Sequence, residues 1–139
     1  MNGNIYLLKK FSKDFLKKIR RFEHHMIVME KMESLKAPVI DAIILRINHC
    51  TVAIDFTDPY NFMNYTTEEY NMIEADVEAQ EKLYQTQMDE ILQLLGAEDP
   101  EEKLHHTEQI KYSFASNPYE ILYELIEDIY LYNKKKKSN

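Results

Sequence analysis

Histidines are the residues with the most capacity for chemistry in this sequence. They are His24, His25, His49, His105 and His106. Glu102 precedes His105 by three residues, and this Glu-x-x-His step is an element that di-iron helical bundles use twice. The chain has no second step of this kind. Adjacent residues on a helix point about 100° apart, so neither histidine pair is expected to chelate a metal as a unit. We therefore predict no metal site and no cofactor.

Nucleophilic catalysis has little support in the sequence. Cys50 is the only cysteine, which excludes a disulfide framework and a multi-cysteine zinc site. Its candidate bases, His49 and Asp55, are merely neighbours in the sequence, and a lone cysteine on an apolar face is typical of a small buried hydrophobe. Only two glycines are present, so no glycine-rich phosphate loop can be written. We predict that the protein is not an enzyme and has no small-molecule substrate.

A basic face in the N-terminal segment is the sharpest functional feature. Seven of the thirteen residues in 9–21 are lysine or arginine, opposed only by Asp14. The candidate binding residues are Lys10, Lys13, Lys17, Arg20 and Arg21. A basic amphipathic helix can bind an anionic membrane, a phosphate backbone or an acidic protein groove. The net charge of −7 opposes the approach of the whole molecule to nucleic acid.

Charge is distributed in blocks along the chain. Residues 1–36 carry +5, residues 37–102 carry −13 and residues 103–139 carry +1, with four consecutive lysines at 134–137. Such asymmetry indicates an ionic partner. The alternative is that the basic N-terminal helix packs beside the acidic middle part of the chain within the same fold.

Apolar spacing predicts one long helix over residues 4–35. Leu8, Phe15, Phe22 and Met29 recur every seven residues, with Ile5, Ile19 and Met26 between them. Residues 38–56 are ambiguous, because five apolar residues share a helical face while residues 52–56 alternate like a strand. We favour a buried helix to about residue 54, since no second strand is visible to pair with.

Local signals mark the later elements more clearly. Residues 57–65 read as a loop, and Thr66 with Glu69 forms a capping box for a second long helix that Gly96 ends. Asp99-Pro100 begins a third helix to about residue 115, in which Leu104, Ile110 and Phe114 are the expected buried positions. Asn117-Pro118 begins a last, strongly apolar helix over 118–133. The lysine-rich tail is expected to be solvated.

These elements predict one all-α domain over residues 1–133, followed by a tail at 134–139. The expected architecture is an elongated bundle of four or five helices, two of them long, with a helix–turn–helix pair at the C-terminus. A helix of 32 residues would be roughly 48 Å long, which exceeds the expected width of a compact domain of this size. Exposed apolar seams at the ends of such helices favour self-association or a protein partner.

The sequence thus favours a non-catalytic interaction or assembly protein. It binds another protein or its own copies through the ends of its long helices, and a subunit of a virus or phage particle fits the composition. The alternative is a small regulator that contacts nucleic acid or an anionic membrane through residues 9–21. No secretory signal or membrane span is visible, so the expected location is the cytoplasm, or the virion if the protein is viral.

Overall fold

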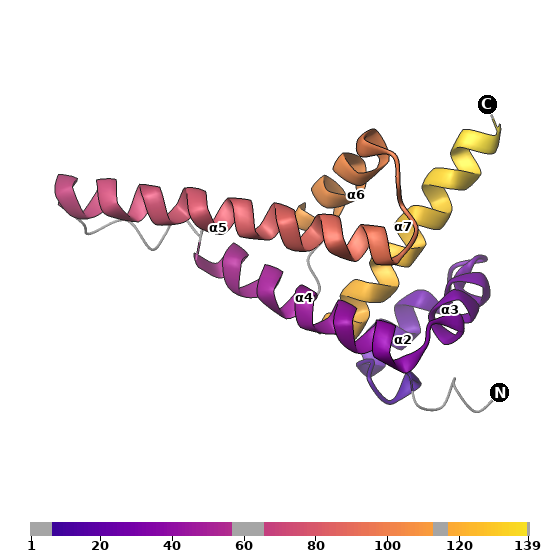
Figure 1. The fold of residues 1–139 in the computed structure, drawn as a ribbon. Helices are drawn as coiled ribbons and strands as arrows, with labels where there is room; N and C mark the ends of the chain where they lie inside the picture. Colours follow the sequence, from indigo (N-terminus) through magenta and orange to yellow (C-terminus); the bar gives the residue numbers. More distant parts are fainter. Residues whose placement is uncertain (1–6, 57–65, 113–116, 139) are drawn as a thin grey trace.

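The computed structural model describes residues 7–56, 66–112 and 117–138, which form six helices and no strand (Figure 1). The helices are α2 (Lys13–Ile19), α3 (His25–Ser34), α4 (Ala37–Phe56), α5 (Thr67–Leu94), α6 (Pro100–Tyr112) and α7 (Pro118–Ser138). The predicted all-α class is confirmed, although the number of helices is six and not four or five. No helix in these described ranges combines the length and apolar character needed to cross a membrane.

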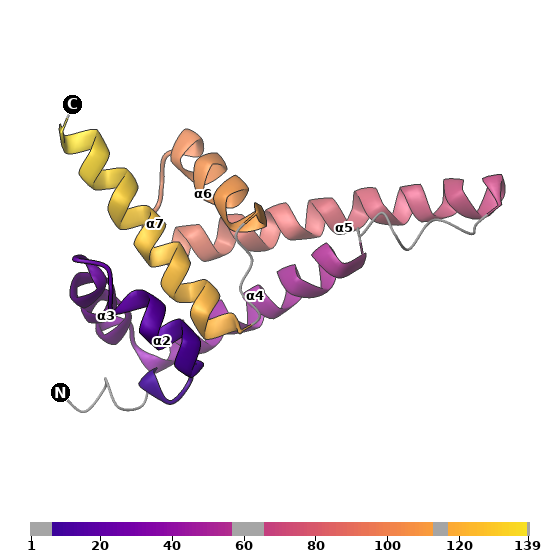
Figure 2. The same cartoon turned by 180° about the vertical axis from the view of Figure 1, so that it is seen from behind.

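Helices α4 and α5 pack side by side as an antiparallel pair (Figures 1 and 2). Arg46 Nε donates to Glu90 Oε2 across the pair at 2.8 Å. Beneath this ion pair, α4 buries Ile43, Ile47 and Cys50 against the core. The predicted helix over 38–54 is confirmed, and the strand-like alternation at its end lies within the helix.

Both predicted ends of α5 are confirmed. The Thr66 hydroxyl accepts from the Glu69 backbone N–H at 3.2 Å, and the Glu69 carboxylate accepts from the Thr66 N–H at 3.4 Å. Gly96, just beyond the helix, has a φ of 90°, which side chains other than glycine rarely allow. The loop predicted at 57–65 lies outside the described residues.

The single helix predicted over residues 4–35 is wrong. The chain forms two short helices instead, α2 and α3, separated by a turn at residues 20–24. Ser12 caps α2, because its hydroxyl accepts from the Phe15 N–H at 3.2 Å. The seven-residue spacing survives only in part: Phe15 and Met29 are buried, whereas Met26 is exposed.

Contacts with α7 explain why the predicted helix is interrupted at Ser12, before α2, and again at the turn of residues 20–24. Glu120 accepts from the Ser12 backbone N–H at 3.3 Å and from its hydroxyl at 3.5 Å. In the turn, His24 Nε2 lies 2.7 Å from Glu127 Oε2, and its ring stacks with those of Phe22 and Tyr130. The N-terminal segment therefore folds back onto α7 in two pieces.

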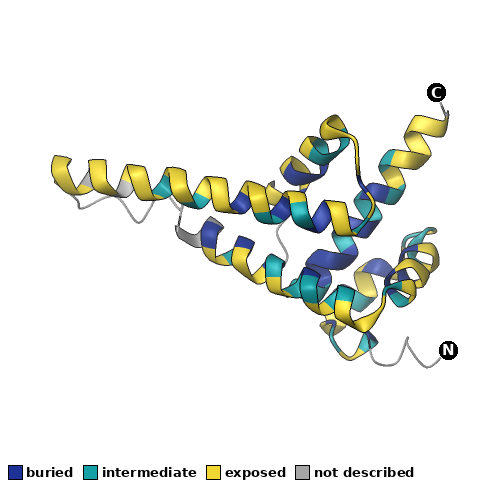
Figure 3. Ribbon diagram, viewed as in Figure 1, coloured by how far each residue is buried: buried dark blue, intermediate teal, exposed yellow. Residues whose placement is uncertain are grey.

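Helix α7 supplies much of the core. Leu122, Tyr123 and Leu125 have no exposed surface, and the dark blue part of α7 in Figure 3 lies where the other helices meet. The rings of Phe11 and Phe15 stand edge-on to Tyr123, with centroids 6.2 and 5.5 Å away. The apolar face predicted for this helix is confirmed.

Helix α6 begins as predicted, and only part of its predicted buried set is buried. The Asp99 side chain accepts from the Glu101 N–H at 2.9 Å at the start of the helix. Ile110 is buried as expected, Leu104 is exposed, and Phe114 lies outside the described residues. His106 occupies the interior in place of Leu104, because α6 turns its histidine side toward α7.

Helix α7 continues beyond residue 133 to Ser138, so the four lysines stand on its last turns. Their side chains are exposed, as expected for a solvated segment. Cations at the C-terminal end of a helix interact favourably with its dipole, which supports this extension.

Candidate functional site

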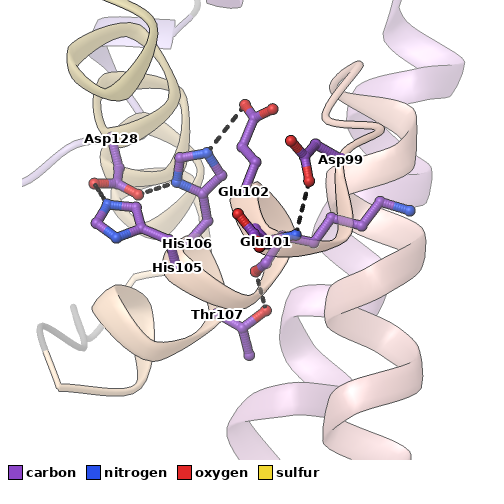
Figure 4. A network of polar contacts seen from close by, with 8 residues as sticks. Asp99, Glu101, Glu102, His105, His106, Thr107 and Asp128 are labelled. Atoms are coloured by element: carbon purple, nitrogen blue, oxygen red, sulfur yellow. Dashed lines mark hydrogen bonds and ion pairs between the residues drawn. The ribbon is translucent and has the colours of Figure 1, made fainter. Parts of the chain in front are cut away.

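Two adjacent histidines of α6 meet one carboxylate of α7 (Figure 4). His106 Nδ1 is hydrogen-bonded to Asp128 Oδ2, and His105 Nε2 lies 3.6 Å from Asp128 Oδ1. The other nitrogen of His106, Nε2, lies 3.3 Å from Glu102 Oε1, one turn earlier on α6. We call His105, His106, Asp128 and Glu102 the histidine cluster.

The buried member of the histidine cluster is His106, whose side chain has no exposed surface. Burial lowers the pKa of His106, but the hydrogen bond and charge of Asp128, followed by those of Glu102, outweigh burial and raise it. The imidazolium form therefore fits between the two carboxylates.

Aromatic and polar groups frame the histidine cluster. The ring of Tyr132 lies 5.2 Å from that of His105 and 5.4 Å from that of His106, centroid to centroid. A surface pocket of about 500 Å³ opens beside them, and Lys135 is among its lining residues together with His105, Asp128 and Tyr132. The cluster thus combines imidazole and carboxylate donors with a route to solvent.

An acidic face of α7 meets the basic N-terminal segment. Glu120 binds Ser12, Glu127 binds His24, and Glu124 Oε1 lies 3.8 Å from Lys18 Nζ. The three glutamates are spaced by four and three residues, so they share one face of the helix. Part of the basic segment is thus paired within the fold, although with glutamates of α7 and not with the acidic middle of the chain.

Glu124 is the most perturbed carboxyl on this face. Burial raises its pKa to about 7, the Lys18 ammonium opposes that rise, and the neighbouring Glu127 and Glu120 add to it. Its Oε2 atom is buried without a hydrogen-bond partner among the residues that the structure describes. Ionised Glu124 is consequently a poorly compensated charge.

The predicted basic binding residues divide into two groups. Lys10 is partly buried, and its ammonium lies 5.3 Å from the centre of the Tyr119 ring. The side chains of Lys13, Lys17, Arg20 and Arg21 are exposed. None of these four forms an ion pair with a residue in the described part of the chain.

An exposed apolar line runs along α5. Met72, Leu83 and Leu94 are 72%, 39% and 41% exposed. They recur every eleven residues, which is close to three helical turns, so they lie on nearly the same side of the helix. The small residues Ala75, Ala79 and Thr86 fall beside this line and are exposed too. We call these six residues the α5 stripe.

Cys50 shows no sign of an activated nucleophile. Its thiol is buried and donates to the Tyr84 carbonyl oxygen at 3.9 Å, and burial raises its pKa to about 12. His49, its predicted candidate base, instead faces Gln87, with Nδ1 3.4 Å from Oε1. Cys50 acts as a small hydrophobe of the α4–α5 interface, as expected.

Comparisons with protein-family models, curated proteins and solved structures find no match. Asp128, the partner of both histidines, could not be found from the sequence, because nothing in the sequence shows which turn of α7 faces α6. Glu102 and His106 are four residues apart, and that helical spacing was a usable signal.

Proposed function

We propose that this chain is a non-catalytic assembly protein that binds a protein partner, a second copy of itself included, through its long helix α5. The observation that carries the proposal is the α5 stripe. Large apolar side chains that line up on an exposed helix face are typical of a surface that another protein covers.

The position of α5 in the fold supports this proposal. Its N-terminal turns extend past the end of α4, and no other described helix lies beside them (Figures 1 and 2). Figure 3 shows most of the described residues of these turns as exposed. The α5 stripe lies about a quarter turn from the face that buries Tyr84 and Ile91. A partner can therefore pack on α5 without displacing α4.

The charge of the N-terminal half of α5 indicates which kind of protein surface can bind there. Residues 66–82 hold six acidic residues and one basic residue, so this half of α5 favours a basic surface over another acidic one. Exposed basic residues occur on α2 and at the end of α7 of the same chain. A second copy of the chain therefore offers the complementary charge. Copies joined in this way would form an elongated particle, which fits an assembly role.

Light scattering after size exclusion tests the proposal at low and at high salt. We expect a defined oligomer that persists at high salt, because apolar contacts are not screened. The double variant Met72→Glu, Leu83→Glu should weaken the association by about a hundredfold, since losing two partly buried apolar side chains removes roughly 3 kcal/mol.

Leu104→Glu is the matched control, because Leu104 is an exposed leucine of α6 outside the α5 stripe. It should leave the oligomer mass unchanged, and circular dichroism should show all variants equally helical. A monomer at both salts would refute self-assembly, and an equal loss in the Leu104 control would show that the α5 stripe is not the interface.

A second candidate function rests on four exposed cations of α2 and of the turn that follows it. Lys13 and Lys17 are one turn apart, and Arg20 and Arg21 extend the same side of the segment. A regulator that contacts nucleic acid or an anionic membrane would use this surface. The lysines at the end of α7 would add a second basic surface.

The variant Lys13→Glu, Lys17→Glu, Arg21→Glu tests this second function. We expect it to lose any salt-sensitive binding to duplex DNA or to phosphatidylserine vesicles, while the oligomer mass stays the same. If the triple variant dissociates the oligomer instead, the basic face is part of the protein interface and the two functions are one.

A further inference from the structure

The two adjacent histidines converge on Asp128 because they use different ring nitrogens. His105 reaches with Nε2, the far nitrogen, and His106 with Nδ1, the near one. Their side chains leave the helix in different directions, yet one ligand atom from each of His105, His106 and Asp128 lies within 4.8 Å of the other two. The angle of about 100° between adjacent residues on a helix therefore does not keep the two rings from sharing Asp128.

We propose that His105, His106 and Asp128 bind a divalent transition-metal ion, with Zn²⁺ as the best match to the donor set. Two imidazole nitrogens and one carboxylate are ligands that zinc takes in proteins, with water in the fourth position. The filled d shell of Zn²⁺ imposes no fixed coordination geometry. The ion therefore tolerates the ligand directions that two adjacent residues of one helix offer. This inference is independent of the proposed assembly role.

The cluster needs little movement to hold the ion. Ligand atoms around a tetrahedral zinc lie roughly 3 Å apart, because each bond is about 2 Å long. His105 Nε2 is 3.6 Å from Asp128 Oδ1, and the His105 side chain is 41% exposed, so its ring can turn. His106 Nδ1 and Asp128 Oδ2 are in direct hydrogen-bond contact, closer than two ligands of one ion. The ion would therefore replace the proton that this pair shares, and the Asp128 carboxylate would turn outward to admit it, while the packing of α6 on α7 keeps it within reach.

Glu102 supplies a second, independent feature of a metal site. A histidine that ligates through one nitrogen usually donates its other N–H to a carboxylate, which orients the ring. Glu102 Oε1 stands 3.3 Å from His106 Nε2, the nitrogen that does not face Asp128 (Figure 4). His106 is also fully buried, so its orientation is set by the core.

The pocket beside the cluster gives the fourth position access to solvent. His105 and Asp128 line it together with Lys135 and Lys136. Water can enter from this side and complete the coordination. Because the ligands come from α6 and α7, the ion would also join these two helices and stabilise their packing.

Calorimetric titration of the chelator-treated full chain with ZnCl₂ tests the proposal. We expect one ion per chain and a higher melting temperature with Zn²⁺, and CoCl₂ should give the visible absorption of a tetrahedral cobalt site. His105→Asn should weaken zinc binding by at least about tenfold, and Glu102→Gln should weaken it by about 10- to 100-fold. His105 is partly exposed, so its variant is expected to fold.

His49→Asn is the matched control, since His49 is an exposed histidine on α4, outside the cluster. It should bind zinc as the wild type does. Absence of binding heat and of a melting shift in the wild type would overturn the proposal and leave the cluster as a buried ion network. Equal losses in His49→Asn and His105→Asn would overturn it too, because zinc would then bind surface histidines without selection.

Discussion

Replacing Glu124 with glutamine should raise the free energy of unfolding at pH 8 by roughly 2–3 kcal/mol. Burial raises the pKa of this carboxyl from 4.5 to about 7. Each unit of such a difference corresponds to about 1.4 kcal/mol between the folded and unfolded states. Glutamine has almost the same shape and brings no charge, so it removes the penalty of ionising a buried group.

The pH dependence of this gain follows from proton linkage. Between pH 4.5 and 7, the folded wild type holds a proton on Glu124 that the unfolded chain has released. Stability of the wild type therefore falls as the pH rises through this window, and the loss is complete above the folded pKa. The glutamine variant lacks this contribution, so its advantage is largest at pH 8 and mostly gone at pH 5.

Loss of the ion pair with Lys18 does not offset the gain. The Lys18 side chain is 61% exposed and its Nζ is 3.8 Å from Glu124 Oε1, so the pair contributes little. Urea unfolding of both proteins at pH 5 and pH 8 measures the difference. Glu108→Gln, an exposed glutamate of α6, is the control and should change stability at neither pH. A gain that is the same at both pH values would contradict the mechanism.

Local signals in the sequence predicted helix ends better than helix continuity. The Thr66 capping box, Gly96 and Asp99-Pro100 each act within a few residues, and the structure shows all three as expected. The break at residues 20–24 has no such local signal, since the seven-residue apolar spacing passes straight through it. It depends on Glu127, about a hundred residues away, which binds His24.

The functional surfaces likewise differ in how far the sequence predicts them, because some depend on one segment and others on contacts between distant helices. The sequence placed exposed cations on the N-terminal segment, and four of the five predicted residues are exposed. Lys10 differs, because its backbone carbonyl accepts from Asn117 Nδ2 at 2.6 Å and its ammonium lies over Tyr119. The histidine cluster depends on the packing of α6 against α7, which no pattern within either helix specifies.

The α5 stripe could be read only in part from the sequence. The apolar spacing of Tyr84 and Ile91 predicts that Leu94, three residues further on, belongs to the same seam, whereas the structure shows Leu94 on the exposed side. Three apolar residues spaced by eleven cannot be recognised as a second, exposed face of the helix until its buried face is known. Once Tyr84, Met88 and Ile91 are seen to face the core, the remaining apolar residues stand out. Burial thus separates residues that fold the chain from residues available to a partner.

Two substitutions of Tyr123, to alanine and to phenylalanine, should affect the free energy of unfolding in different ways. Its side chain has no exposed surface and contacts the rings of Phe11 and Phe15, which join the N-terminal segment to α7. Tyr123→Ala would empty the centre of this packing, and we expect a loss of about 3–5 kcal/mol in the free energy of unfolding. Near-ultraviolet circular dichroism should lose the aromatic signal of this cluster.

Tyr123→Phe should keep the packing and remove a buried hydroxyl. This hydroxyl has no hydrogen-bond partner in the described part of the chain, and burial followed by the Glu127 charge raises its pKa. An unsatisfied buried polar group costs about 1–3 kcal/mol, so the phenylalanine variant should be as stable as the wild type or up to about 1 kcal/mol more stable in urea unfolding. A clear loss of stability in Tyr123→Phe would mean that the hydroxyl is satisfied in solution. The difference between the two variants therefore separates what the ring contributes to folding from what its oxygen costs.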